Sequence, residues 1–323
     1  MQQAQGDIRA SRASGFLLVA LAAALWGSDA LFRRGLALEL PAATVVFVEH
    51  LILVVFTLPL LVRAIRAARS FTTVDWVAMI LVGAGASALA TVLFTAAFRW
   101  GEPNTPLLLQ KLQPLVAVLG ARMLLGERLL PRYAAYFLVA MTGAYLVTFP
   151  DPGRVTVARL APALLALGAA ALWGMGTVLG RHLTAKMEVP PLTALRFGIG
   201  LAAGAVIVVP LEGASAVGAV RPSDLPALFL LAMIPGLLAL LLYYRGLGRT
   251  PAAAATLAEL AFPLAAVSIN FLAFGATLSR TQWLGLALLA GTITIMGLQS
   301  QRSSQALGVE PGGRMIGTRV EAA

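Results

Sequence analysis

Charged and titratable side chains inside long apolar runs are the residues of this sequence best suited to chemistry. Six of them interrupt such runs: Asp29, Glu49, His50, Lys111, Arg196 and Glu259. A charge at the centre of a bilayer costs about 2.5–3.5 kcal/mol or more, so each is expected to face the interior of a helix bundle and to have a partner. The chemistry they indicate is ion pairing, proton carriage or recognition of a polar ligand.

An internal repeat suggests how the charges pair. Glu49 aligns with Arg196 at a spacing of 147 residues. Gln110, the neighbour of Lys111, aligns with Glu259 at a spacing of 149 residues. The signs are therefore exchanged between the halves, and we predict two buried ion pairs, Glu49 with Lys111 and Arg196 with Glu259. The alternative for Arg196 is that its long side chain reaches the membrane surface and pairs with nothing.

These pairings leave the carboxylate of Asp29 unmatched, and His50 is the nearest candidate partner by depth. An unpartnered carboxylate in a membrane cavity could bind a substrate amine or carry a coupling proton. Asp29 could equally cap a bend after Trp26-Gly27-Ser28. Both alternatives stay open at the level of the sequence.

Aromatic residues inside the apolar runs are candidates for a substrate cavity. Trp26 and Trp173 could stack on an aromatic or cationic substrate, or they could serve as plain packing. Phe94 with Phe98 and Tyr243 with Tyr244 are weaker cases of the same kind. The predicted substrate-binding or cavity residues are Trp26, Ser28, Asp29, Glu49, His50, Phe94, Phe98, Lys111, Gln113, Trp173, Tyr243 and Tyr244.

Several kinds of chemistry are not indicated. The sequence contains no cysteine and two histidines, so it predicts neither a thiolate site nor a histidine-rich metal site. It contains no phosphate-cradling Gly-Lys-Ser/Thr loop and no nucleophile elbow. We therefore expect a protein that is not an enzyme, binds no metal or cofactor and does not hydrolyse ATP.

The elements that must position these residues are long enough to cross a hydrocarbon core of about 30 Å. Apolar segments lie near residues 15–36, 42–62, 74–98, 103–122, 131–149, 160–180, 190–211, 223–245, 251–274 and 281–299. We therefore predict an all-α integral membrane protein with ten transmembrane helices. The tail 300–323 is expected to be cytoplasmic and disordered.

The repeat divides the chain into two five-helix halves, residues 14–150 and 151–299, after a cytoplasmic segment 1–13. Leu25-Trp26-Gly27 returns as Leu172-Trp173-Gly174. Pro114 returns as Pro263, where helix kinks are predicted. Because five is odd, the second half must insert upside down, and such inverted repeats enclose a central cavity in many secondary transporters.

Composition and charge agree with this architecture. The residues are 59% hydrophobic and 12% charged, with a mean hydropathy of +0.86, which excludes a soluble domain. The net charge of +10 is scattered over short loops and does not indicate nucleic acid. Of the 24 Lys and Arg residues, 15 fall on one side, seven on the other and two within spans, so both termini are expected in the cytoplasm.

Three short motifs carry a family resemblance: Leu25-Trp26-Gly27, Leu112-Gln113-Pro114 and Gly126-Glu127-Arg128-Leu129. With the five-plus-five repeat, they resemble the EamA family of the drug/metabolite transporter superfamily. The resemblance implies a cavity formed mainly by helices 1–4 and 6–9, with helices 5 and 10 at the periphery. Gly275-Ala276 lacks the acid of the third motif, so a symmetric role for Glu127 is not implied.

The resemblance also implies a function, namely export of small metabolites across the bacterial inner membrane by alternating access, as in similar exporters of aromatic amino acids. The alternative is efflux of cationic drugs such as quaternary ammonium compounds, and a membrane enzyme or passive channel is less favoured. The expected partners are the lipid bilayer and a small-molecule substrate. The sequence leaves the coupling ion and the oligomeric state open.

Overall fold

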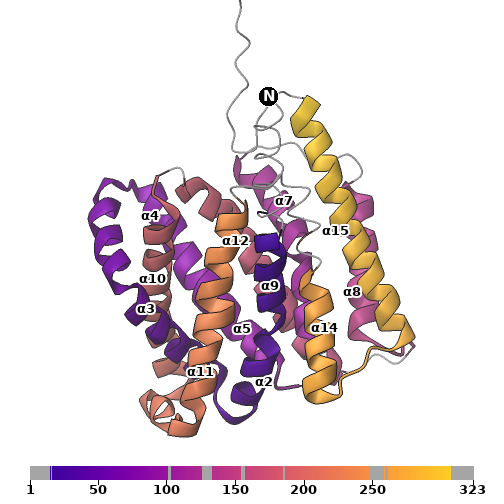
Figure 1. Ribbon diagram of the computed structural model, residues 1–323, viewed down its shortest axis with the longest axis horizontal. Helices are drawn as coiled ribbons and strands as arrows, with labels where there is room; N and C mark the ends of the chain where they lie inside the picture. The colour runs from indigo at the N-terminus through magenta and orange to yellow at the C-terminus, as the bar shows by residue number, and fades with distance from the viewer. Residues whose placement is uncertain are drawn as a thin grey trace, which may run out of the picture.

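The computed structural model of the protein is helical, and its described residues contain no strand. The structure describes residues 17–100, 103–125, 133–153, 157–184, 186–247 and 261–306, together with Gly15 and Ala258. Figure 1 shows the helices gathered in one bundle, with α3, α4 and α10 at one side and α8 and α15 at the other.

The helices of the first half follow a helical stretch over residues 17–27. They are α2 (Asp29–Glu39), α3 (Ala42–Ala67), α4 (Thr73–Ile80), α5 (Ala90–Ala97), α6 (Asn104–Leu109), α7 (Gln113–Leu125) and α8 (Tyr133–Thr148). Those of the second half are α9 (Val157–Thr184), α10 (Val189–Glu212), α11 (Leu225–Leu231), α12 (Ala239–Leu247), α14 (Ala261–Phe274) and α15 (Arg280–Ala306).

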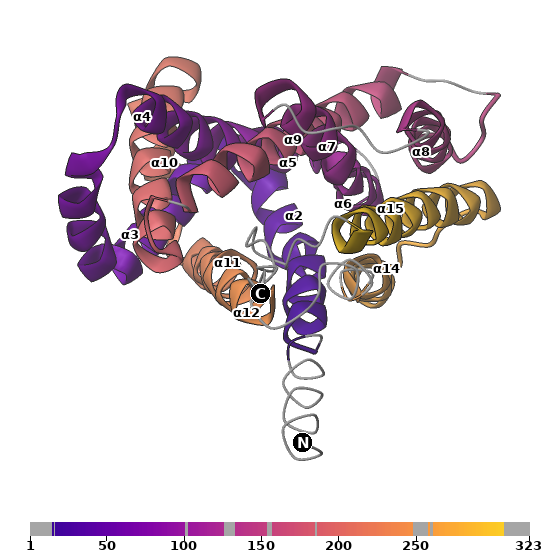
Figure 2. The ribbon, with the colours of Figure 1, turned by 90° about the horizontal axis from the view of Figure 1, so that it is seen from above.

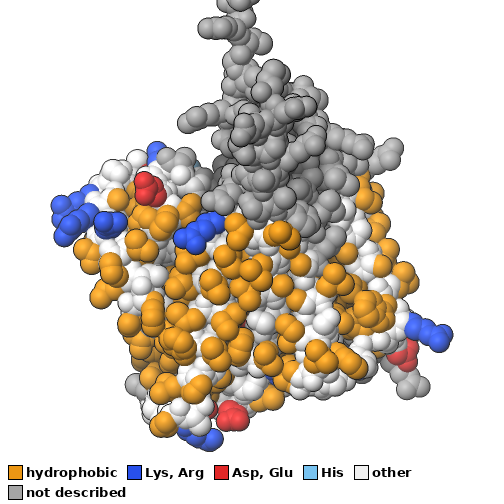
Figure 3. All heavy atoms as spheres, viewed as in Figure 1, with side chains coloured by type: hydrophobic (Ala, Val, Ile, Leu, Met, Phe, Trp, Pro, Cys, Tyr) orange, Lys and Arg blue, Asp and Glu red, His pale blue; other side chains and the backbone are white. Residues whose placement is uncertain are grey.

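Apolar side chains cover much of the outer surface. Figure 3 shows them spread over one face of the bundle, with the Lys and Arg side chains at its margins. Among the described residues, five helices are long and apolar enough to cross a membrane: Ala42–Ser70, Thr73–Ala97, Arg159–Thr184, Val189–Glu212 and Pro222–Tyr243. Helices suit such an environment because each satisfies its backbone hydrogen bonds internally. The chain is therefore an all-helical membrane protein.

The segments predicted as spans are helical wherever the structure describes them, apart from a turn at Ser28 and residues at their ends. The boundary of the predicted tail is different. α15 continues through Ala306, so residues 300–306 belong to a helix, and residues 307–323 lie outside the described part of the chain.

Two π-helical segments interrupt the third apolar run of each half. The first, η2 (Leu81–Leu89), connects α4 to α5, and the second, η6 (Ala232–Leu238), connects α11 to α12. Pro235 lies within η6 and has no N–H to continue the α-helical hydrogen bonds. At the repeat spacing of 149 residues, 81–89 corresponds to 230–238, so the two segments occupy equivalent positions.

The two prolines predicted to kink helices lie within helical segments. Pro114 is the second residue of α7, directly after the 3₁₀ turn η3 (Gln110–Leu112). Pro263 lies in α14 and is buried. The irregularity described in the fourth apolar run is the change from η3 to α7.

Two of the helix pairs that join the halves lie on opposite sides of the bundle. α3 packs along α10, and α8 packs along α15 on the other side of the bundle (Figure 2). A Cβ atom on Gly143 of α8 would lie 2.9 Å from the carbonyl oxygen of Gly285 of α15, and one on Gly285 would lie 2.6 Å from that of Gly143. Glycine at both positions lets the backbones approach closely. The candidate site lies between these pairs.

Candidate functional site

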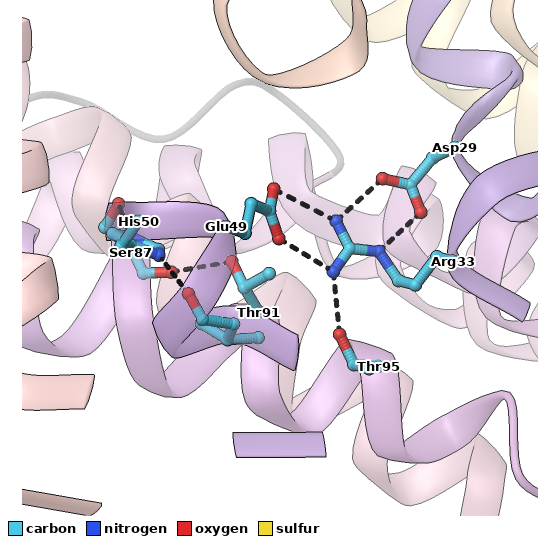
Figure 4. A network of polar contacts seen from close by, with 8 residues as sticks. Asp29, Arg33, Glu49, His50, Ser87, Thr91 and Thr95 are labelled. Carbon is cyan, nitrogen blue, oxygen red and sulfur yellow. Dashed lines mark hydrogen bonds and ion pairs between the residues drawn. The ribbon is translucent and has the colours of Figure 1, made fainter. Parts of the chain in front are cut away.

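A buried ion network joins α2, α3 and α5. The guanidinium of Arg33 donates to both oxygens of Asp29 at 2.6 and 2.9 Å and to both oxygens of Glu49 at 3.1 and 3.3 Å. It also donates to the hydroxyl of Thr95 at 2.8 Å. These bonds use all five N–H groups of the guanidinium. Figure 4 shows Arg33 between the two carboxylates.

This network corrects three expectations from the sequence. Arg33 was counted among the seven Lys and Arg residues on the side opposite the termini, but it is 3% exposed because α2 continues to Glu39. Glu49 was expected to pair with Lys111, and it is bound by Arg33 instead. Asp29 is likewise held by Arg33 and not by His50. The spacing of Asp29 and Arg33, four residues on one helix, was the signal that could have identified this pair.

The other predicted charges have different surroundings. The ammonium of Lys111, on η3, lies 3.8 Å from the ring centroid of Phe262 on α14, a cation–π contact between the halves. Arg196 on α10 donates to the carbonyl oxygen of Ala86 at 3.4 Å. Glu259, its predicted partner, lies outside the described residues.

His50 and Ser28 make structural hydrogen bonds. His50 is buried, and its ring nitrogens lie 2.9 Å from the carbonyl oxygen of Val46 and 3.0 Å from the hydroxyl of Ser87. It thereby ties α3 to η2. The hydroxyl of Ser28 donates to the carbonyl oxygen of Leu25 at 2.6 Å, within the turn that separates residues 17–27 from α2.

An aromatic cluster lies beside the ion network. The rings of Trp26 and Tyr243 are 5.0 Å apart, and Trp173 meets Phe94 edge-on at 5.1 Å. Phe94 also meets Phe98 at 5.1 Å. The two phenylalanines are buried in the core, whereas the two tryptophans are only partly buried. The side chain of Tyr244 lies outside the described residues.

The glycine after each tryptophan explains why the tryptophans lie at helix contacts. A Cβ atom on Gly27 would lie 2.9 Å from the carbonyl oxygen of Phe262 on α14. One on Gly174 would lie 2.8 Å from the carbonyl oxygen of Gln113 on α7. The amide of Gln113 in turn donates to the hydroxyl of Thr177 at 3.1 Å, one turn after Trp173.

Three polar contacts were not predicted from the sequence. Asn270 donates to Asn104 at 2.7 Å, and both are buried. His182 lies 2.7 Å from Asp75, whose other oxygen accepts from the backbone of Thr72 at the start of α4. The Thr72-x-x-Asp75 pattern is a recognisable helix start. The two asparagines give no such local signal, because 166 residues separate them.

The described residues hold no group of His, Cys, Asp and Glu that could bind a metal. What they hold is an ion network and an aromatic cluster inside an apolar helical bundle. A comparison with protein families matches the EamA-like transporter family to residues 13–149 and again to residues 160–298. The chain belongs to this family and is a membrane transporter.

Two named proteins and one solved structure are similar to most of this chain. The riboflavin transporter ImpX of Fusobacterium nucleatum is 31% identical over 277 residues, which cover 83% of this chain and 92% of that protein. A riboflavin transporter of Rhizobium johnstonii is 28% identical over 273 residues, covering 82% and 84%. A solved crystal structure with 22% identity and a TM-score of 0.59 covers 90% of this chain and 99% of its own, and it shares the fold.

Proposed function

We propose that this protein carries a flavin such as riboflavin across the bacterial inner membrane by alternating access between two inverted five-helix halves. The observation that carries the proposal is that relatives covering more than four fifths of this chain are named riboflavin transporters. The geometry of the aromatic cluster supports it. The export of amino acids inferred from the family resemblance stays a prediction, and neither of these relatives bears such a name.

Helix contacts support the inverted repeat. Exchanging the halves maps the contact of Gly27 with Phe262 onto that of Gly174 with Gln113, because each residue replaces its repeat mate. The same exchange relates η2 to η6. It maps the pairs α3–α10 and α8–α15 onto themselves. A two-fold axis through these two pairs would produce this pattern, and transporters of this build bind substrate near such an axis.

The aromatic cluster suits a flat, uncharged ring system. Trp26 and Trp173 are repeat mates that keep part of their surface exposed and pack against one core cluster. A flavin presents a tricyclic face for stacking and an imide edge for hydrogen bonds. Gln113 and Thr177, beside Trp173, are neutral groups that could meet this edge.

The ion network argues against efflux of cationic drugs. Among the described residues, Asp29 and Glu49 were the carboxylates expected to bind a quaternary ammonium group, and Arg33 binds both oxygens of each. An additional cation would have to displace charge-assisted hydrogen bonds, which are about twice as strong as neutral ones. A neutral substrate needs no such displacement.

Tryptophan variants test the proposed substrate. Trp26→Ala and Trp173→Ala should each weaken riboflavin binding about twofold to tenfold, because aromatic stacking contributes about 0.5–1.5 kcal/mol beyond area burial. Affinity is measured by the quenching of riboflavin fluorescence on titration with purified protein. Trp283→Ala is the matched control, since Trp283 is 50% exposed near the start of α15. Equal affinities for all three variants would contradict a flavin site at the cluster.

The proposed orientation has both termini in the cytoplasm. Burial of Arg33 strengthens the charge bias, since it leaves 15 Lys and Arg residues on the predicted cytoplasmic side against six on the other. Because the chain contains no cysteine, Ser70→Cys and Asp151→Cys report sidedness directly. In intact cells an impermeant thiol reagent should modify Asp151→Cys and spare Ser70→Cys. The reverse labelling pattern would mean that every span has the opposite orientation to the one proposed.

A further inference from the structure

The ion network lies at one end of the bundle and ties three helices together there. α2 ends at Glu39 and α3 begins at Ala42, so the network lies near the end of the bundle that is marked by this turn; we call it the Glu39 end. Glu49 lies eight residues after Pro41, about 12 Å from the start of its helix. Thr95, near the end of α5, lies at the same depth in the bundle as Glu49, since Arg33 donates to both side chains.

The network holds one more negative charge than positive. Each carboxylate accepts N–H groups on both oxygens, and Arg33 has no further donor to offer. A proton on either carboxyl group removes its negative charge and turns its charge-assisted hydrogen bonds to Arg33 into weaker neutral ones. Protonation therefore loosens the network.

The two carboxylates are not equivalent. Asp29 and Arg33 lie one turn apart on α2, so their pair survives any rigid movement of that helix. Glu49 provides the only described ion pair from Arg33 to another helix, and its bonds are longer, at 3.1 and 3.3 Å against 2.6 and 2.9 Å. A proton on Glu49 thus removes the link between α2 and α3 and leaves the pair within α2 intact.

The opposite end of the bundle carries no repeat of this network. At the repeat spacing of 147 residues, Asp29 corresponds to Gly176 and Arg33 to Gly180. Glu49 corresponds to Arg196, which donates to the carbonyl oxygen of Ala86. Because the ion network is present in one half alone, it should affect the two ends of an alternating-access transporter unequally.

The neighbouring charged and titratable groups face other partners. Arg34 lies over the ring of Phe274, and His50 binds Val46 and Ser87. Glu212 of α10 accepts from the backbone at the start of α3, at Ala43 and Thr44. In the described part of the chain none of these groups, nor Arg196, is bonded to Asp29 or Glu49. Glu49 is therefore the carboxylate of the network that joins two helices.

We propose that the Asp29–Arg33–Glu49 network is a proton-operated gate: it closes the Glu39 end while both carboxylates are ionised, and it releases α2 from α3 when Glu49 binds a proton. The side chains of Asp29 and Glu49 keep 11% and 7% of their surface exposed, so the proposed proton comes from water. The proposal rests on transport by the family and not on flavin as the substrate.

Thiol accessibility without any substrate tests the gate. Thr91 lies one turn deeper than Thr95 and is partly buried, so Thr91→Cys reports opening. Ser223→Cys, exposed at the same end next to Arg221, is the control. An impermeant thiol reagent is applied from the Glu39 end, and the ratio of the two modification rates is measured at pH 8 and pH 5.

In the parent protein the ratio should rise about tenfold or more at pH 5, since protonation of Glu49 weakens the charge-assisted hydrogen bonds that hold α2 to α3. Glu49→Gln mimics the protonated state and should give the high ratio at pH 8, with no further rise at pH 5. Thr95→Val removes a neutral partner and should keep the pH response. Taking the ratio of the two rates at each pH removes the change in ionisation that both thiols share.

A parent ratio that does not change with pH would overturn the gate, as would a Glu49→Gln ratio equal to that of the parent at pH 8. If Glu49→Gln does not fold, the pH response of the parent decides alone. Because no flavin is present, failure of this test leaves the proposed substrate untouched, and failure of flavin binding leaves the gate untouched.

Discussion

An Arg33→Met variant is expected to lose about 3–5 kcal/mol of its free energy of unfolding. The substitution keeps the apolar stem but leaves Asp29 and Glu49 as two buried carboxylates with no counter-charge from Arg33. The loss is measured by unfolding in mixed micelles, followed by circular dichroism. In the same variant α2 should be held to α3 less strongly than in the parent protein, because the ion pair of Arg33 with Glu49 is lost.

Two further variants separate loss of the charge from loss of the side chain. Arg63→Met is the matched control, because Arg63 lies exposed on α3 and should change stability little. A triple variant with Asp29→Asn, Arg33→Met and Glu49→Gln removes all three charges and should recover part of the lost stability. A single Arg33→Met variant as stable as Arg63→Met would mean that the network contributes nothing to folding.

Alanine at Gly27 or Gly174 is expected to destabilise the protein by about 1–3 kcal/mol, the usual cost of overpacking. The added Cβ would lie 2.9 Å from the carbonyl oxygen of Phe262 at Gly27 and 2.8 Å from that of Gln113 at Gly174. Both obstacles are backbone atoms, so relief requires the helices to separate. The same micelle unfolding experiment measures the effect.

The bundle supplies a control glycine on the same run for each position. A Cβ atom on Gly35 or on Gly180 would meet nothing within 4 Å. Gly35→Ala and Gly180→Ala should therefore be neutral or stabilising by up to about 1 kcal/mol, through helix propensity alone. Destabilisation as large at these positions as at Gly27 and Gly174 would show that helix contacts are not the cause.

Much of the architecture could be predicted from local pattern. Apolar length predicted the helical segments, because a helix in lipid must bury its backbone hydrogen bonds over a fixed thickness. The repeated Leu-Trp-Gly motif marked positions that the structure places at helix contacts, through Gly27 and Gly174. The resemblance to the EamA family agrees with the family match.

Which partner each charged side chain contacts could not be predicted in the same way. Repeat alignment identifies equivalent positions, but the direction of a side chain depends on where each helix begins and on its rotation. The first span was predicted at residues 15–36 with Arg33 counted on the outer side, whereas α2 continues to Glu39 and buries Arg33. Lys111 was matched with Glu49 from the exchanged signs of the repeat, and its ammonium lies over Phe262. The Asn104–Asn270 contact depends on packing across 166 residues.

Counterflow of radiolabelled riboflavin in proteoliposomes tests the central claim most directly. Vesicles loaded with unlabelled riboflavin and carrying the purified protein should transiently accumulate the labelled compound, whichever way the protein is oriented. Unlabelled riboflavin added outside should abolish the accumulation, while phenylalanine and methyl viologen should not. If riboflavin gives the same signal as protein-free vesicles, and phenylalanine or methyl viologen instead shows counterflow, flavin transport by this protein is contradicted.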